Sequence, residues 1–179
     1  MRIRSFVLAA TLVAILAPSL APSLALAAAQ PPSKPVSAAF YTGKWYEVAR
    51  TPNAGQRDCQ AATTQFTDKG AEGFTVVQIC HKGSASGPPK TFNTTGKIAA
   101  GSQNAKFRMS FLGGLKKQEY WVLDRAGDQS WAIMATPGGN FVWLLSRDAV
   151  MSPAARATAL ARVKALGYAK LEFPKQPPA

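Results

Sequence analysis

The chain has few side chains that could perform covalent or acid–base chemistry. Its one histidine, His81, lies at the end of a predicted strand, and Ser146 has no base near it in the sequence. No cluster of His, Cys and carboxylates has the spacing of a metal site, and no glycine-rich loop precedes a helix to hold phosphate. Glu47 and Asp124 would form a carboxylate pair only if the fold brought them together. We therefore predict no catalytic residue, no metal and no cofactor, and an enzyme remains an alternative.

The two cysteines, Cys59 and Cys80, have the spacing of a disulfide across a hairpin. Between them, "FTDKGAEGF" carries turn residues that separate two alternating apolar runs. If the turn is centred near Gly70, Phe66 opposes Phe74 and Cys59 opposes Cys80 to within one residue. Opposed residues on antiparallel strands have the separation that a disulfide needs. We predict a Cys59–Cys80 bridge.

The N-terminus has the pattern of a secretory signal peptide over residues 1–29. A basic start is followed by an apolar run and by small residues that suit a cleavage site. Pro18 and Pro22 interrupt the run before it reaches the length of a membrane span. No cysteine lies near the cleavage site, so we expect no lipid anchor there. The expected location is the periplasm or the external medium, where cysteines oxidise.

The formal net charge is +12, with 21 basic and nine acidic residues. Such a surface attracts anionic membranes or polysaccharides through long-range fields. Charge alone does not select a partner. An interaction protein that binds polyanions with its basic surface therefore remains an alternative, although we expect no nucleic acid partner.

Short alternating runs cut by Gly, Pro, Asn and Asp follow a flexible, proline-rich lead-in at residues 30–39. In "AKFRMSF", for example, Phe107, Met109 and Phe111 share one face of a strand. Eight such runs without intervening helices predict an all-β antiparallel barrel or sandwich. The predicted strands are 44–51, 60–67, 73–80, 90–99, 105–112, 118–124, 129–135 and 140–147.

One helix is predicted at about residues 153–166. Ser152 suits the N-cap, Pro153 the first helical position and Gly167 the end. Its apolar residues recur on one side, so we expect it to lie against the outside of the barrel. A basic helix on a membrane surface is the alternative. "AKLEF" at residues 169–173 predicts a last short strand.

Three segments resemble the signatures of the lipocalins, and of the bacterial lipocalins in particular. They are "GKWYEVAR", "YWVLDRAG" and "FVWLLSRD", in the family's order. The resemblance covers residues 40–177 and implies an eight-stranded up-and-down barrel. It also implies that Trp45 closes one end, with Arg147 across the indole, Gly43 making room and Asp124 at the same end. The cation–π contact is physically reasonable.

A barrel of eight strands encloses room for one small ligand. Strand alternation and the resemblance together predict an apolar lining, which suits a fatty acid or lysophospholipid. The family implies carriage or scavenging of such a molecule, as in envelope maintenance or stress; an enzyme on this barrel is the alternative. Glu47 is expected to point inward, and Lys82, Lys116 and Lys117 to lie at the mouth. The predicted lining residues are Phe107, Met109, Phe111, Tyr120, Val122, Met134, Phe141, Trp143 and Leu145.

Overall fold

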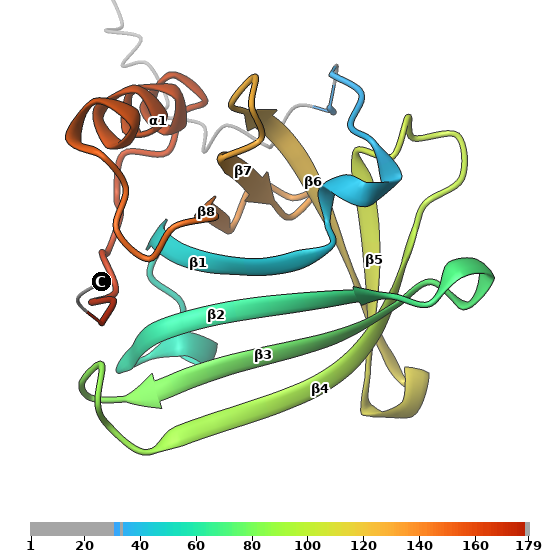
Figure 1. Ribbon diagram of the computed structural model, residues 1–179, viewed down its shortest axis with the longest axis horizontal. Helices are drawn as coiled ribbons and strands as arrows, with labels where there is room; N and C mark the ends of the chain where they lie inside the picture. Colours follow the sequence, from blue (N-terminus) through green and yellow to red (C-terminus); the bar gives the residue numbers. More distant parts are fainter. Residues whose placement is uncertain (1–30, 33, 178–179) are drawn as a thin grey trace, which may run out of the picture.

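The computed structural model describes residues 31–32 and 34–177, and the predicted signal peptide lies outside them. Eight antiparallel strands form a closed barrel in which each pairs with the next and β8 pairs with β1 (Figure 1). This confirms the predicted eight-stranded barrel with one C-terminal helix. The elements are β1 (Gly43–Arg50), β2 (Cys59–Asp68), β3 (Phe74–Lys82), β4 (Pro89–Ile98), β5 (Lys106–Phe111), β6 (Lys116–Arg125), β7 (Trp131–Ala135), β8 (Val142–Ser146) and α1 (Pro153–Ala165).

The β2–β3 hairpin is stapled by the predicted disulfide between Cys59 and Cys80, whose Cα atoms are 5.3 Å apart. The predicted register was wrong by two residues, because Phe66 opposes Val76. A bulge between Gln60 and Thr63 moves the pairing back by one residue, so Cys59 opposes Lys82, two residues from Cys80, and the bridge runs diagonally. Linking residues 21 apart in the sequence restricts the unfolded chain and stabilises the fold by about 3 kcal/mol.

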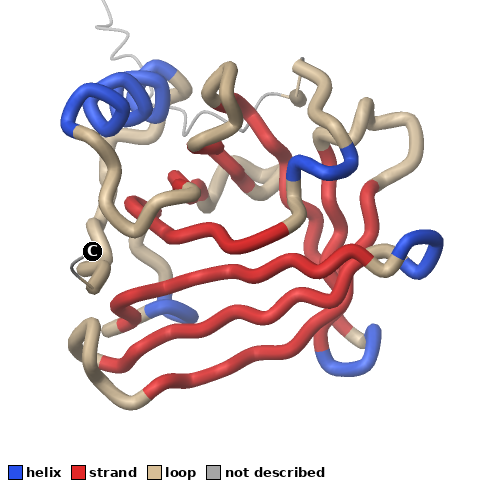
Figure 2. Tube along the Cα trace, viewed as in Figure 1, coloured by secondary structure: helices blue, strands red, loops and turns tan. Residues whose placement is uncertain are grey.

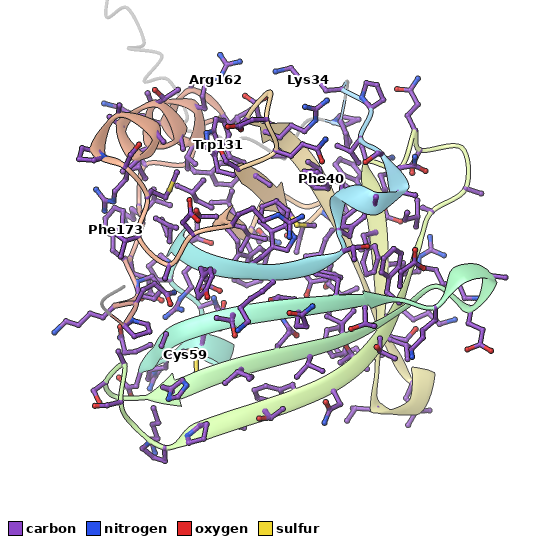
Figure 3. All side chains as sticks on the ribbon, in the orientation of Figure 1. Lys34, Phe40, Cys59, Trp131, Arg162 and Phe173 are labelled. Atoms are coloured by element: carbon purple, nitrogen blue, oxygen red, sulfur yellow. A yellow bond between two sulfur atoms is a disulfide. The ribbon has the colours of Figure 1, made fainter. Side chains whose placement is uncertain are left out.

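One end of the barrel is filled by aromatic side chains. Phe40 and Tyr41, which precede β1, are each 1% exposed, and Phe66, Phe74 and Phe107 pack against the Tyr41 ring. Figure 3 shows Phe40 at this end and Cys59 far from it. We call this the closed end. The loops at residues 51–58, 83–88, 112–115 and 136–141 surround the opposite end, the mouth.

Part of the proline-rich lead-in contacts the closed end through Val36. Val36 is buried, its backbone N–H donates to Gln103 O at 3.1 Å, and Asn104 donates to Val36 O at 3.0 Å. Val36 therefore buries apolar surface, whereas its neighbours Pro35 and Ser37 are exposed.

Helix α1 lies outside the barrel, as predicted. Ser152 caps it by accepting from Ala155 N at 3.3 Å, and Gly167 follows its end with φ of 93°. Ala159 and Val163 are buried against β7 and β8 in a second apolar cluster. The apolar face of α1 is therefore occupied and is not available to a membrane. No helix in the described part of the chain is long and apolar enough to cross a bilayer.

The C-terminal segment completes the barrel wall near the mouth. Pairing of β1 with β2 ends at Tyr46 and Thr63, and the chain after α1 enters the space beyond. There Glu172 forms an antiparallel bridge with Arg50, and Ala61 N donates to Lys175 O at 2.7 Å. Gln176 Nε2 donates to Glu47 O on one strand, at 2.7 Å, and to Ala62 O on the other, at 3.2 Å. The predicted strand at 169–173 thus exists only as this bridge.

Candidate ligand-binding site

The register of the barrel shows which side chains point inward, because directly opposed residues share a face of a sheet. Trp45 opposes Thr64, Thr64 opposes Gln78, and Gln78 opposes Phe92. On the other side, Val122 opposes Met134, which opposes Trp143. Each of these two rows runs across the barrel interior.

The inward-facing side chains are buried at the closed end and become more exposed toward the mouth. Along β5, Phe107 is fully buried, Met109 is 3% exposed and Phe111 is half-buried. Exposure rises from 8% at Leu145 in β8 to 36% at Phe141, the residue directly before that strand. Solvent therefore reaches the interior from the mouth side only as far as the middle of the strands.

Phe107 lies at the closed end of the barrel and not in the side wall of a cavity. Its ring is 4.8 Å from that of Tyr41 and 5.4 Å from those of Phe66 and Phe74. It also occupies the space above Gly96, where a Cβ atom would lie 2.2 Å from the ring. Phe107 is thus part of the aromatic floor. Met109, Val122, Met134 and Leu145 are packed against this floor in the same apolar cluster.

An aromatic wall rises above this floor toward the mouth. The ring of Trp143 is 5.6 Å from Tyr120 and 6.0 Å from Phe141. Burial raises the pKa of Tyr120 to about 12, so its hydroxyl is protonated at neutral pH. The wall combines apolar ring surface with one hydroxyl donor.

The interior is more polar than the alternation of apolar residues suggested. Thr64 and Gln78 share the inward row of Trp45, and Gln118 opposes Met109. All three are half-buried. The predicted lining contained mainly apolar residues and therefore omitted these three. Strand parity on β2, β3 and β6 would have identified them.

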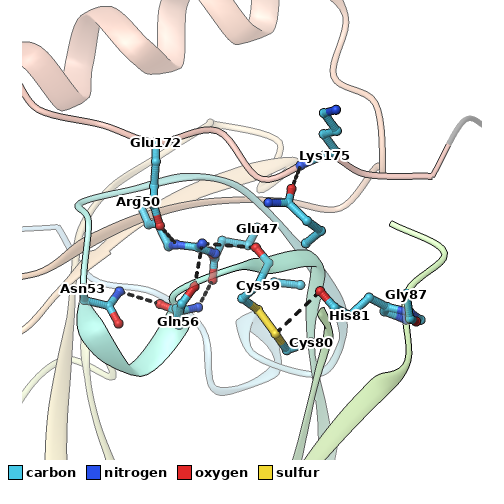
Figure 4. The surroundings of a disulfide bond; sticks show 12 residues. Glu47, Arg50, Asn53, Gln56, Cys59, Cys80, His81, Gly87, Glu172 and Lys175 are labelled. Carbon is cyan, nitrogen blue, oxygen red and sulfur yellow. Dashed lines mark hydrogen bonds and ion pairs between the residues drawn. A yellow bond between two sulfur atoms is a disulfide. The ribbon is translucent and has the colours of Figure 1, made fainter. Parts of the chain in front are cut away.

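Glu47 and Arg50 form a buried ion pair near the mouth, which Figure 4 shows beside the disulfide. Arg50 donates to Glu47 Oε1 at 2.5 Å, to the Glu172 carboxylate, and to the backbone oxygens of Gln56 and Cys59. Gln56, in the β1–β2 loop, donates to Glu47 Oε2 at 2.8 Å and accepts from Trp143 Nε1 at 2.8 Å. This network joins the loop to the aromatic wall.

Burial raises the pKa of Glu47, and the hydrogen bonds and charge of Arg50 oppose that rise. An unpaired buried carboxylate would be costly, so Arg50 and Gln56 compensate it. Glu47 points inward, as expected, but its oxygens are occupied by these two residues. The sequence analysis did not assign a role to Arg50, although it ends the segment "GKWYEVAR", or to Gln56, which lies in a loop outside the quoted motifs.

The closed end contains the arrangement that the resemblance implied. The Arg147 guanidinium lies 3.6 Å from the centroid of the Trp45 ring and donates to the backbone oxygens of Phe40, Thr42 and Lys44. Gly43 has φ of 99°, and a Cβ there would lie 3.2 Å from Arg147 Nη1. The glycine supplies both a left-handed backbone and room for the guanidinium.

Asp124 also lies at this end, but on the outer face. Strict alternation along β6 would place Asp124 on the inward face with Tyr120 and Val122, but a bulge after Val122 places it opposite Ile133. There it accepts from Lys34 at 2.7 Å and from Arg162 of α1 at 2.8 Å. Figure 3 shows Lys34 and Arg162 on the same side of the molecule. Asp124 thus ties the lead-in and the helix to β6.

Replacing Asp124 with asparagine should lower the free energy of unfolding by about 1–2 kcal/mol at neutral pH, since charged hydrogen bonds are lost. Burial alone would raise the pKa of Asp124, but hydrogen bonds from Lys34, Arg125 N and Arg162 outweigh it and lower the pKa. A lowered pKa in the folded state gives stability above the unfolded value and loses it on acidification. The difference between the two proteins should therefore shrink below about pH 4. Urea unfolding at several pH values measures it, and a difference that grows on acidification would contradict this account.

The residues considered for catalysis lie apart and have separate partners. His81 Nδ1 lies 2.8 Å from Gly87 O in the β3–β4 turn, and Ser146 Oγ accepts from Asp148 N. Among the described residues, no group of three or more His, Cys, Asp or Glu could hold a metal ion. A surface depression of about 510 Å³ at the closed end, near Gly101 and Glu119, contains none of the predicted lining residues.

Comparison with known proteins agrees with this geometry. A family model described as a lipocalin-like domain matches residues 36–178. The outer membrane lipoprotein Blc of Vibrio cholerae is 29% identical over 108 residues, which are 60% of this chain and 62% of that protein, less than two thirds of its length.

Two solved structures share the fold. Insecticyanin from the tobacco hornworm Manduca sexta has a TM-score of 0.64 at 18% identity, over 81% of this chain and 83% of that one. The cockroach allergen Per a 4 has a TM-score of 0.63 at 16% identity, over 84% and 96%. Barrel topology, the Arg147–Trp45 closure and the family match together show that the chain belongs to the lipocalin family.

Proposed function

We propose that this protein binds a single-chain amphiphile, a fatty acid or a lysophospholipid, inside the barrel, and that it carries or scavenges that molecule. The observation that carries the proposal is the graded interior, which is dry and apolar at the floor and mixed in polarity near the mouth. A molecule with a hydrocarbon tail and one polar end has the same gradient.

The tail would lie against Met109, Val122 and Met134, with its upper part along Trp143. Burial of eight to ten methylenes would contribute about 6–8 kcal/mol before the costs of association and ordering. Two methionines allow the lining to adapt to different chain shapes. Micromolar affinity is the expected outcome, with tolerance of chain length and unsaturation.

The polar end would lie among the inward-facing polar side chains. Tyr120 supplies a hydroxyl donor, and Gln78 and Gln118 supply both donors and acceptors at the height where the interior becomes accessible. Glu47 is committed to Arg50 and Gln56, so it is not the primary headgroup contact. The basic residues Lys82 and Lys116, at the mouth ends of their strands, would favour a carboxylate or phosphate there.

The proposed place of action is the cell envelope or the external medium, reached through the predicted signal peptide. The disulfide supports an oxidising compartment. The Vibrio cholerae relative is named as an outer membrane lipoprotein. This similarity supports a role in the envelope.

The test is a fluorescence titration of delipidated protein with a fatty acid and a lysophospholipid that carry bromine on the chain. Bromine quenches a nearby indole, so saturable quenching is expected in the wild type and should be much weaker in Trp143→Phe. Burial of a chain persists at high salt, whereas adsorption to the basic surface does not. A flat titration across chain lengths and headgroups would refute the proposal.

A further inference from the structure

The short loop between β5 and β6 exposes two leucines at the mouth. Leu112 is 76% exposed and Leu115 is 91% exposed, more than any other large apolar side chain in the described part of the protein. Figure 2 shows this segment as a helical turn where β5 and β6 meet. Residues 112–117, "LGGLKK", are called the mouth loop below.

No packing among the residues that the structure describes accounts for these leucines. Neither packs in the two apolar clusters of the barrel. Leu112 has φ of 52°, a left-handed backbone conformation that is unfavourable for leucine. The next two residues, Gly113 and Gly114, also have positive φ, which glycine adopts without steric cost. Polar residues would suit an exposed turn better. Two exposed leucines in one turn therefore indicate a contact with another molecule.

The charge beside the leucines indicates the kind of partner. Lys116 and Lys117 follow directly, are exposed, and form no ion pair with any residue that the structure describes. Apolar tips with lysines behind them match a bilayer interface, where leucines enter the acyl region and lysines stay at anionic headgroups. We propose that the mouth loop docks the protein on an anionic phospholipid bilayer.

This docking would place the mouth against the lipid. Lys116 opposes Phe111, which lies on the inward row of β5 with Met109. The docked loop is therefore continuous with the interior wall, and an amphiphile could move between the bilayer and the barrel without crossing water. Helix α1 cannot take this role, because its apolar face is already buried.

The experiment is co-sedimentation of the mature protein with phosphatidylcholine vesicles, pure or containing roughly one third phosphatidylglycerol. Binding to the mixed vesicles, and little to the pure ones, is expected. Leu112→Ser with Leu115→Ser should reduce partitioning at least roughly tenfold. Lys116→Glu with Lys117→Glu should reduce it at least roughly tenfold at low salt.

Matched controls lie away from the mouth. Val150, 59% exposed in the β8–α1 connection, can be replaced by serine. Lys69 and Lys97, exposed at the closed end, can both be replaced by glutamate. The proposal is overturned if these controls bind as weakly as the loop variants, or if the leucine variant binds as well as the wild type. Fatty acid affinity of the leucine variant, measured without vesicles, should be unchanged, so docking and ligand binding are tested separately.

Discussion

Replacing Trp45 with alanine is expected to lower the free energy of unfolding by about 3–5 kcal/mol, the range for removing a large buried aromatic side chain. Trp45 is 2% exposed, its ring centroid lies 5.3 Å from that of Phe40, and its Nε1 donates to Tyr41 O at 3.1 Å. The change also removes the ring face against which Arg147 lies. Guanidinium chloride unfolding measures the loss.

Trp45→Phe is the matched control for this change. It keeps a ring beneath Arg147 but loses the indole donor, so a smaller loss is expected. Ligand affinity of the folded fraction should be the same in both variants, because Trp45 lies below the accessible part of the interior. A loss under about 1 kcal/mol in Trp45→Ala would show that the closed end does not depend on this ring.

Replacing Trp143 with aspartate is expected to weaken binding of a fatty acid at least roughly 30-fold, since burial against the indole is lost and a carboxylate faces the chain. Trp143 is half-buried, and its ring lies between those of Tyr120 and Phe141. Stability should change less than in Trp45→Ala, because part of the side chain already faces solvent. Titration with a fluorescent fatty acid measures affinity independently of the protein's own tryptophans.

The hydrogen bond from Trp143 to Gln56 complicates this variant, because its loss also frees the β1–β2 loop. Trp143→Phe removes the bond and keeps an apolar ring, and only a several-fold loss is expected. If phenylalanine were as damaging as aspartate, the loop contact would matter more than the wall. If Trp45→Ala abolished binding and Trp143→Asp only lowered stability, the assignment of floor and wall would be reversed.

The sequence predicted the barrel because alternation reports strand faces directly. Phe107, Met109 and Phe111 all face inward as expected, and Ala159 and Val163 bury the predicted side of the helix. The Arg147–Trp45 contact came from the family resemblance. What alternation cannot give is depth along the barrel axis, so it did not distinguish Phe107 in the floor from Phe111 near the mouth.

The two errors in register have different causes. The β2–β3 turn pairs Phe66 with Val76, two residues from the predicted partner, and this register places Cys59 and Cys80 diagonally instead of directly opposite each other. The bulge after Val122 turned Asp124 outward. Apolar alternation reports neither the exact centre of a turn nor the position of a bulge. The Glu47–Arg50–Gln56 network could not be foreseen either, because it joins β1 to a loop and to the C-terminal segment around Glu172.

Native mass spectrometry of the protein purified without detergent shows whether the barrel interior holds a hydrocarbon chain. A population carrying one bound molecule is expected, with the mass of a fatty acid or lysophospholipid. The released lipid should be identifiable by extraction, and the adduct should be depleted in Trp143→Asp. Protein that emerges without an adduct, and that takes up neither lipid when both are added, would contradict the claim that the barrel interior holds a hydrocarbon chain.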